Sequence, residues 1–309
     1  MKIIDLHCDV LMKMLHNPAI SFADSDLLSV NYKQLEGTNS RLQYFAIYVS
    51  EHIHPSIRYE AVLKMISIFY RNILSMPKMK LIQSVKDYQK LSDDEIGAVL
   101  ALEGCDAIQD DIGRLATLKQ LGVSSVGLTW NYANVFADGS LECRNAGLSI
   151  KGRQLAQWLK RHRLTLDVSH LSEAGFWDCV QIGGKLFASH SNCRSICDHP
   201  RNLYDNQITE LINHNGLIGL TFVPKFVTKD RQATINQLLH HIDHIAALGG
   251  IEHIGFGSDF DGTEEYVGGL HTYSCYNALI EEMMKHYTFA QVEGFLYKNY
   301  ERFLLNKPN

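Results

Sequence analysis

The stretch TLDVSHLSEAGFWDCVQIGGKLFASH, residues 165–190, contains the unit that decides the fold. A short apolar run at 165–168 is followed by a longer segment and then by a second apolar run at 186–188. Each run is followed by a histidine, His170 and His190. Two strands joined by a connection of this length form a parallel βαβ unit. We therefore predict two neighbouring parallel strands that present these histidines side by side.

The same unit recurs along the chain, and this recurrence predicts a barrel. Between the short apolar runs the apolar period becomes helical, as in the stripe Val62, Ile66 and Phe69. Eight buried strands alternating with helices are typical of a (β/α)8 TIM barrel. The alternative is a doubly wound open sheet, but no GxGxxG motif follows the first strand. The predicted strands are 2–6, 42–49, 96–102, 125–129, 165–168, 186–188, 217–222 and 253–256.

Two helix starts are marked by capping boxes. Thr234 precedes Gln237 by three residues, and Thr288 precedes Gln291 by the same spacing. In a capping box these side chains satisfy backbone amides that the first helical turn leaves free. We predict that one helix begins after Thr234 and another after Thr288.

Composition limits the kind of protein. The 309 residues are 46% hydrophobic and 20% charged, which excludes disorder, collagen and coiled coil. Six prolines and no Ser/Gly-rich linker predict a single domain over 1–309. Seven cysteines without a CxxC cluster favour reduced thiols over disulfides. A net charge of -5 without a basic tract predicts no nucleic-acid partner. Because no apolar signal segment or membrane-length run is present, we expect a cytoplasmic protein with no membrane partner.

Polar side chains gather where the predicted strands end, and barrel enzymes place their active sites at that edge. His7 and Asp9 are alternate residues after the first strand, so both side chains face one side and can approach one divalent cation. On its own this pair is also typical of a polar rim. Glu103 ends an apolar run, where a buried carboxylate is costly unless it is paired with a cation or bound to a metal. The alternative for Glu103 is a buried ion pair.

His170 and His190 add two ligands from adjacent strands. Together with His7, Asp9 and Glu103 they exceed the needs of one zinc ion and are enough for two metals that share Glu103. Two neighbouring cations can hold a bridging hydroxide and polarise a carbonyl, as hydrolysis of an amide requires. The residues therefore predict metal-assisted hydrolysis, with Glu103 at the centre of the reaction.

Three further residues receive roles from their positions near the predicted barrel mouth. Asp259 lies in the strand end GFGSDFDG and is predicted to act as a general acid/base that passes a proton to the leaving nitrogen. Asp261 precedes a glycine, which is more typical of a turn aspartate that caps the following segment. Arg201 follows the sixth strand, where a guanidinium can hold a substrate carboxylate.

Seven ordered motifs together resemble the membrane (renal) dipeptidase family, zinc peptidases on a metal-dependent hydrolase barrel. This resemblance covers nearly the whole chain and is more specific than any one motif. It implies a zinc-dependent dipeptidase, active also on dipeptides with a C-terminal D-amino acid, and a homodimer. The motifs are DLHCD at 5–9, LEG at 102–104, LTWN at 128–131, DVSHLS at 167–172, ASHSN at 188–192, HPRNLYD at 199–205 and GFGSDFDG at 255–262.

Position by position, the resemblance implies two Zn²⁺ ions per chain. Asp259 would serve as acid/base and bind the substrate amine, and Arg201 would hold the free carboxylate of the dipeptide. Only a substrate about two residues long can span these two groups. The implied ligands are His7 and Asp9 for one zinc, His170 and His190 for the other, and Glu103 for both.

The chain departs from the mammalian pattern at Trp130, where that pattern has a histidine after Leu-Thr. Trp130 either donates a hydrogen bond to the scissile carbonyl or forms a wall of the substrate pocket. We also expect no secretory signal and no lipid-anchor tail, as in the soluble bacterial branch that the resemblance suggests. Other readings of the site are lactonase or deacylase activity, or a metal-binding barrel that has lost catalysis. The helix predicted after Thr234 contains three further histidines. We predict that they lie on its polar face and bind no metal: His240, His241 and His244.

Overall fold

The computed structural model describes residues 1–306, and its centre is a parallel barrel. Every ladder between its strands is parallel. The order is β2-β1-β9-β8-β7-β6-β5-β4, and the pairing of β2 with β4 closes the ring. The predicted barrel is confirmed, and the open sheet is excluded. The strands are β1 (Ile3–Asp5), β2 (Ser40–Tyr48), β3 (Met79–Leu81), β4 (Ile96–Glu103), β5 (Val123–Gly127), β6 (Thr165–Asp167), β7 (Lys185–Ala188), β8 (Leu217–Leu220) and β9 (Ile254–Phe256).

The strand predictions miss one strand and extend two others too far. β3 was not predicted; it pairs only with the beginning of β4 and stands outside the ring of eight. Its three residues form too short a run to give a periodic signal. β5 ends at Gly127 and β8 at Leu220, each two residues before the predicted end.

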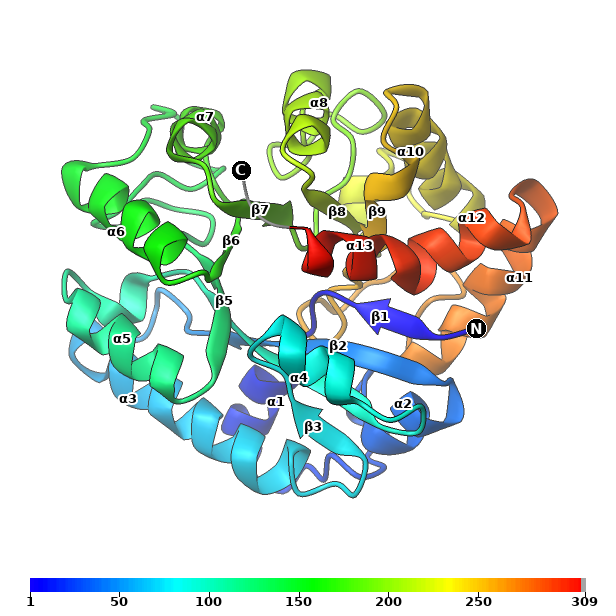
Figure 1. Cartoon of the computed structure of the whole chain (residues 1–309), viewed down its shortest axis with the longest axis horizontal. Helices are drawn as coiled ribbons and strands as arrows, with labels where there is room; N and C mark the ends of the chain where they lie inside the picture. The colour runs from blue at the N-terminus through cyan, green and yellow to red at the C-terminus, as the bar shows by residue number, and fades with distance from the viewer. Residues whose placement is uncertain (307–309) are drawn as a thin grey trace.

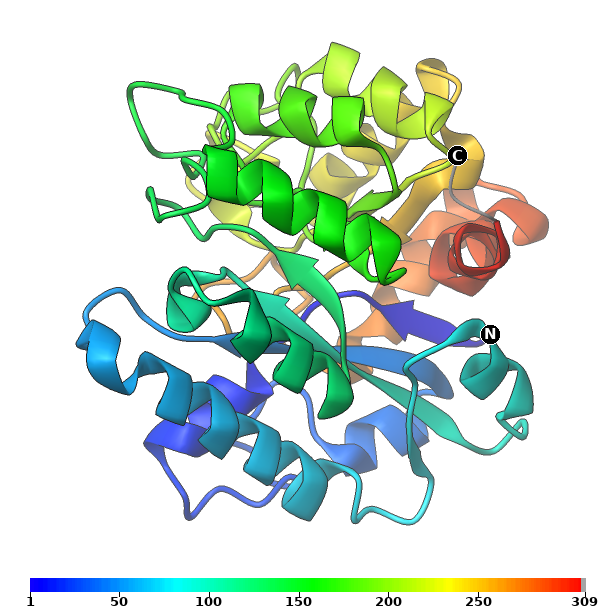
Figure 2. The same cartoon turned by 60° about the vertical axis from the view of Figure 1, so that its left-hand side comes forward.

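Helices surround the strands (Figure 1), and the view in Figure 2 shows α3, α5 and α6 (blue, teal and green) side by side on the outside. Both predicted capping boxes are present, at Thr234 before α10 and at Thr288 before α12. None of the helices within 1–306 combines the length and apolar character that a bilayer crossing needs. The helices are α1 (Val10–His16), α2 (Tyr32–Gly37), α3 (Pro55–Ile68), α4 (Val85–Lys90), α5 (Ile112–Gln120), α6 (Ile150–Arg161), α7 (Glu173–Ile182), α8 (Asp205–Asn213), α9 (Pro224–Val227), α10 (Ile235–Ala247), α11 (Tyr276–His286), α12 (Phe289–Glu293) and α13 (Asn299–Leu305).

Aromatic side chains close the end of the barrel where the strands begin. Helix α13 crosses this end in Figure 1 and places Tyr300 and Phe303 against the barrel interior. The Tyr300 hydroxyl lies 3.1 Å from that of Tyr44 on β2, and the Phe303 ring stacks 5.8 Å from Phe187 on β7. The opposite end, where the strands finish, is left to polar side chains and loops.

His241 on α10 corrects one expectation. It was predicted on the polar face of its helix, but its side chain is fully buried. Its Nδ1 accepts the backbone N–H of Cys193 at 3.0 Å, and its Nε2 lies 2.9 Å from the carbonyl of Val227. These contacts require a neutral ring with the proton on Nε2. His241 therefore joins α10 to the loops after β7 and β8, which the helical spacing alone did not reveal.

The buried His241 makes stability dependent on pH. Burial lowers the pKa of His241 to about 4 from an unfolded value near 6.5. Its contribution is thus present above pH ~6.5 and lost as pH falls toward 4, so lowering pH from ~7.5 to ~5 should reduce the free energy of unfolding by about 2 kcal/mol through this group alone. Urea unfolding of wild type and His241→Gln at both pH values measures this difference. The exposed neighbour His240→Gln is the control, and equal pH dependence in all three proteins would contradict the assignment.

Candidate active site

The barrel brings the predicted polar residues together at one end. All eight barrel strands are parallel, so their carboxyl ends meet at the same edge, and each of the five key side chains lies at or just beyond such an end. All five side chains are at least nine-tenths buried, which keeps bulk water away from their polar atoms. The residues are His7 after β1, Asp9 before α1, Glu103 at the end of β4, His170 after β6 and His190 after β7.

Glu103 lies between His7 and the neighbouring pair His170 and His190, and the His7 and His190 rings are themselves 3.8 Å apart. Its Oε2 lies 3.5 Å from His7 Nε2. Its Oε1 lies 2.8 Å from His170 Nε2 and 3.6 Å from His190 Nε2. The two Nε2 atoms of His170 and His190 are 2.9 Å apart. One carboxylate thus offers one oxygen to each side, which is the arrangement needed to bridge two cations.

Asp9 and Asp259 complete the His7 side. His7 Nε2 lies 3.4 Å from Asp9 Oδ2 and 3.8 Å from Asp259 Oδ1. Ligand atoms of these three residues lie within 4.8 Å of one another, and so do those of His7, Glu103 and His190. The ends of β1 and β9 are tied together because Asp9 N–H donates to Phe260 O at 2.8 Å and Asp259 N–H donates to His7 O at 3.2 Å.

Burial and mutual charge shift the site's pKa values. Burial, and then the Glu103 carboxylate, raises the pKa of Asp9 to about 7. Burial also raises the pKa of Asp259, with Glu103 adding to it. For Glu103 burial acts in the same upward direction, but His7 and His170 outweigh it and lower the pKa below its ordinary value. Burial and then Arg201 lower the pKa of His170 to about 4, so this ring is neutral at pH 7 and free to act as a ligand.

Asp5 holds the His7 segment in place. Its Oδ1 accepts the N–H groups of His7 and Ser258, both at 3.1 Å. Its Oδ2 accepts the Tyr276 hydroxyl at 2.9 Å. The carboxylate is fully buried and links β1, the end of β9 and α11. It therefore fixes the backbone that carries His7 without facing the other site residues.

A second set of partners orients His170 and His190. Asn131 Oδ1 lies 2.9 Å from His170 Nδ1, and Ser189 Oγ lies 2.7 Å from His190 Nδ1. Asp167 accepts the Ser189 hydroxyl and also the Ser189 N–H at 3.0 Å. Both Nδ1 atoms are thereby engaged, so both Nε2 atoms point into the site, as metal-binding histidines require. No role was predicted for Asn131, Asp5 or Asp167. The two aspartates are carboxylates within apolar strands, a signal that could have marked them.

The GFGSDFDG loop has an unusual backbone conformation at two of its residues. Asp259 and Asp261 both have positive φ angles, 65° and 70°, in a backbone region that residues other than glycine rarely adopt. Asp261 does not cap the following segment as predicted. Its carboxylate accepts the N–H groups of Ser29 and Val30, at 2.8 and 3.1 Å, so it anchors a distant loop. A Cβ at Gly262 would meet Asp259 Oδ1 at 2.4 Å, so only glycine fits beside this carboxylate.

Arg201 and Trp130 line the pocket above these groups. The pocket has a volume of about 130 Å³ and also contains Asp9, Glu103 and Asp259. Arg201 is 3% exposed; its Nη2 donates to the His190 carbonyl at 3.2 Å, while its Nη1 is buried without a partner. The Trp130 ring lies 5.0 Å from that of Tyr48 and 6.0 Å from that of His170. Its position fits a pocket wall.

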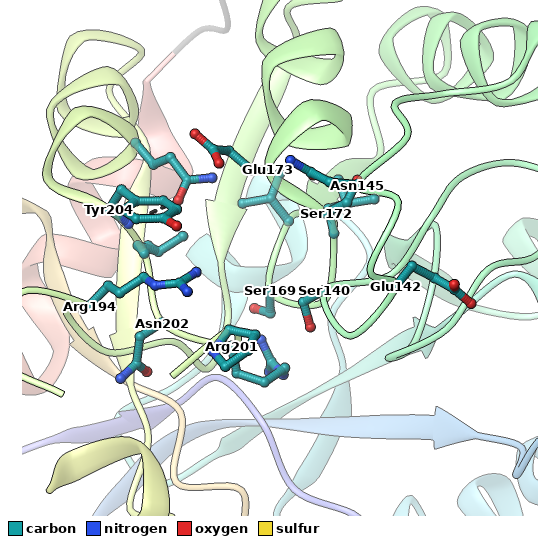
Figure 3. Close-up of a pocket in the computed structure, with 15 residues that line it drawn as sticks. Ser140, Glu142, Asn145, Ser169, Ser172, Glu173, Arg194, Arg201, Asn202 and Tyr204 are labelled. Carbon is teal, nitrogen blue, oxygen red and sulfur yellow. Dashed lines mark hydrogen bonds between the residues drawn. The ribbon is translucent and has the colours of Figure 1, made fainter. Parts of the chain in front are cut away.

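A neighbouring pocket of about 210 Å³ shares Arg201. Figure 3 shows Arg201, Ser169 and Ser140 gathered at one end and Tyr204 and Glu173 at the other. The carboxylates of the metal-binding cluster do not line this space. It therefore adjoins the candidate active site through Arg201 alone among the predicted site residues.

The residues at the barrel mouth fit zinc. His7 Nε2 and Asp9 Oδ1 are buried polar atoms without a hydrogen-bond partner, and such atoms are costly unless another group satisfies them. Imidazole nitrogens and carboxylate oxygens are ligands that Zn²⁺ prefers. Two sets of residues bring ligand atoms within 4.8 Å of one another, and Glu103 and His7 belong to the first of them, so the donor set fits zinc.

Two solved structures share this architecture. A metallopeptidase from Rhodobacter sphaeroides, crystallised with a phosphinate mimic of the dipeptide L-Ala-D-Ala, superposes with a TM-score of 0.91 over 98% of each chain, at 24% sequence identity. Dipeptidase AC, a metallopeptidase of family M19, gives the same TM-score and coverage at 25% identity. Both therefore support the barrel fold along nearly the entire chain.

Sequence comparison identifies the family. An uncharacterized dipeptidase of Schizosaccharomyces pombe is 28% identical over 251 residues, which are 80% of this chain but only 60% of the yeast protein. The family model Membrane dipeptidase (Peptidase family M19) matches residues 1–306. The family predicted from the seven motifs is thus confirmed, and this chain belongs to the membrane dipeptidase family, peptidase family M19.

Proposed function

We propose that this protein is a metallo-dipeptidase that hydrolyses the peptide bond of dipeptides with two zinc ions. The observation that carries the proposal is the position of Glu103, whose Oε2 faces His7 while its Oε1 faces His170 and His190. His7 and Asp9 would hold one ion, His170 and His190 the other, and Glu103 both. When bound, the ions would lower the pKa of a shared water and polarise the scissile carbonyl.

The chain's own residues would position the substrate and move the proton. Asp259 lies beside the ligand cluster and faces the same pocket as Arg201. Its carboxylate can hold the substrate's amino group and pass a proton to the departing nitrogen. Burial raises its pKa above the ordinary value of an aspartate, which makes the carboxyl group a better proton carrier than an exposed one. Trp130 would line the substrate pocket beside Tyr48.

Arg201 would bind the free carboxylate of the dipeptide. Its buried, unpartnered Nη1 supplies a donor for that group. Asp259 and Arg201 then contact the two charged ends of the substrate, so longer peptides do not fit between them. We include D-configured C-terminal residues in the substrate class, since the R. sphaeroides structure holds an L-Ala-D-Ala mimic.

The direct test measures metal content and hydrolysis together. Purified protein loaded with zinc should contain two equivalents per chain and release amino acids from L-Ala-L-Ala and L-Ala-D-Ala. The same assay with lactones and N-acyl amino acids separates this function from lactonase or deacylase activity. One zinc per chain would remove the bridging role, and hydrolysis of lactones alone would replace the proposed substrate.

Arg201→Met tests the carboxylate contact. A charged hydrogen bond contributes roughly 1.5–3 kcal/mol, so kcat/KM for L-Ala-L-Ala should fall by about 10- to 100-fold, mainly through KM. The same variant should change hydrolysis of L-Ala-L-Ala amide, which lacks the free carboxylate, far less. Arg194→Met, in the neighbouring pocket only, is the matched control. Equal losses on acid and amide would show that Arg201 instead supports the metal-binding histidines.

A further inference from the structure

The pocket wall that carries Arg201 holds a second cation, Lys225. Both residues line the active-site pocket together with Phe226. The guanidinium carbon of Arg201 lies 5.6 Å from the centre of the Phe226 ring, and Lys225 Nζ lies 5.2 Å from the same centre. Lys225 follows β8 on the short helix α9 (Pro224–Val227), and Arg201 lies in the loop after β7. Two segments thus place two positive groups against one aromatic ring.

Lys225 is an exposed cation on this wall to which the proposed function assigns no anionic partner. The nearby Lys229 and Arg194 both face Asp198, at 4.0 and 2.9 Å. Lys225 forms no ion pair with any residue in the part of the chain that the structure describes. The carboxylates that share its pocket are Asp9, Glu103 and Asp259, and the proposed function uses all three elsewhere.

The electrostatic environment of His199 shows the same positive field. Its ring packs 4.5 Å from the Phe226 ring. Burial and then the positive charges of Arg201, Lys225 and Arg194 together lower the pKa of His199 to about 4, against the opposing charge of Asp198. With Arg201 and Lys225 both against the Phe226 ring, this wall favours a second anionic group beside the carboxylate that Arg201 would bind.

A dipeptide with an acidic C-terminal residue supplies two carboxylates that are a few covalent bonds apart. One would meet Arg201, and the other would meet the cation on the same ring. We propose that Lys225 selects dipeptides whose C-terminal residue carries an acidic side chain. This inference rests on the proposed dipeptidase function and adds the substrate class for the same site.

The test compares L-Ala-Glu with L-Ala-Gln, each in the C-terminal configuration that zinc-loaded enzyme hydrolyses faster. These substrates have nearly the same shape and differ in one charge. Wild type should prefer the Glu substrate in kcat/KM by about fivefold, through KM, as expected for a partly exposed ion pair. The preference should shrink in high salt because screening weakens exposed charge pairs. Lys225→Met should remove it, whereas the matched control Lys229→Met should retain it.

The remaining outcomes separate this inference from the proposed function. Equal kcat/KM for both substrates in wild type would overturn it. Equal losses on both substrates in Lys225→Met would also overturn it, because Lys225 would then act on the α-carboxylate. If neither dipeptide is hydrolysed, the dipeptidase function fails, and calorimetric binding of the two dipeptides tests the inference alone. Tighter binding of L-Ala-Glu that Lys225→Met abolishes would support it, and equal binding would refute it.

Discussion

Glu103→Gln is expected to lower zinc content and dipeptidase activity together. The substitution keeps the size of a nearly buried side chain but removes its charge, while His7, His170 and His190 remain around it. An amide offers one oxygen instead of two, so it can no longer face both His7 and the pair His170 and His190 as an acceptor. Loss of a group that only supports a metal ligand typically costs about 10- to 100-fold in metal affinity or activity, so losing the proposed shared ligand should lower kcat/KM by at least about 100-fold.

The measurement is metal content by elemental analysis alongside turnover of L-Ala-L-Ala. Two zinc ions per chain in wild type should fall to one or fewer in Glu103→Gln. Glu173→Gln, in the neighbouring pocket, removes a carboxylate close to the site but outside the metal-binding cluster and serves as the control. Full zinc loading with normal turnover in Glu103→Gln would remove the bridge from the proposal.

Asp259→Asn is expected to abolish turnover while zinc content stays near that of wild type. Asparagine preserves the size of the side chain at this positive-φ position, where asparagine is also tolerated. It cannot accept and return a proton, and loss of general acid/base catalysis typically lowers kcat by about 10²- to 10⁴-fold. Zinc content, kcat and KM measured on one preparation separate a proton-transfer role from a ligand role.

Asp261→Asn is a useful contrast because Asp261 has the same backbone conformation two residues away. Its carboxylate holds the Ser29–Val30 loop and lies 3.0 Å from Lys13 Nζ. This variant should lower the melting temperature more than it lowers kcat. If Asp259→Asn instead lost its zinc, Asp259 would be a ligand, and retained turnover would leave it without a chemical role.

Several features could be predicted because they depend on local patterns. Alternation and short apolar runs indicated eight barrel strands, and parallel strands bring their carboxyl ends to one edge. That geometry was enough to place His7, Glu103 and His170 near one another, since each ends such a run or follows it within three residues. The capping boxes at Thr234 and Thr288 depend only on residue spacing within one helical turn, so they could also be predicted from the sequence.

Other features depend on contacts between distant segments. The burial of His241 follows from the packing of α10 against loops after β7 and β8, and its own helix gives no sign of this. Asp5 acquires its partners only when Ser258 and Tyr276 arrive from the other end of the chain. Lys225 follows a strand without any motif, and its relation to Arg201 exists only through Phe226.

The junction between β1 and β9 has a consequence for biosynthesis. Asp9 is joined to Phe260, and Asp5 to Ser258, so residues near the start are fixed by partners that the ribosome adds about 250 residues later. A nascent chain can therefore expose His7 and Asp9 long before anything orders them. Under the proposed ligand assignment, binding of metal with native affinity would need the last strand, β9, and truncated products would remain metal-free.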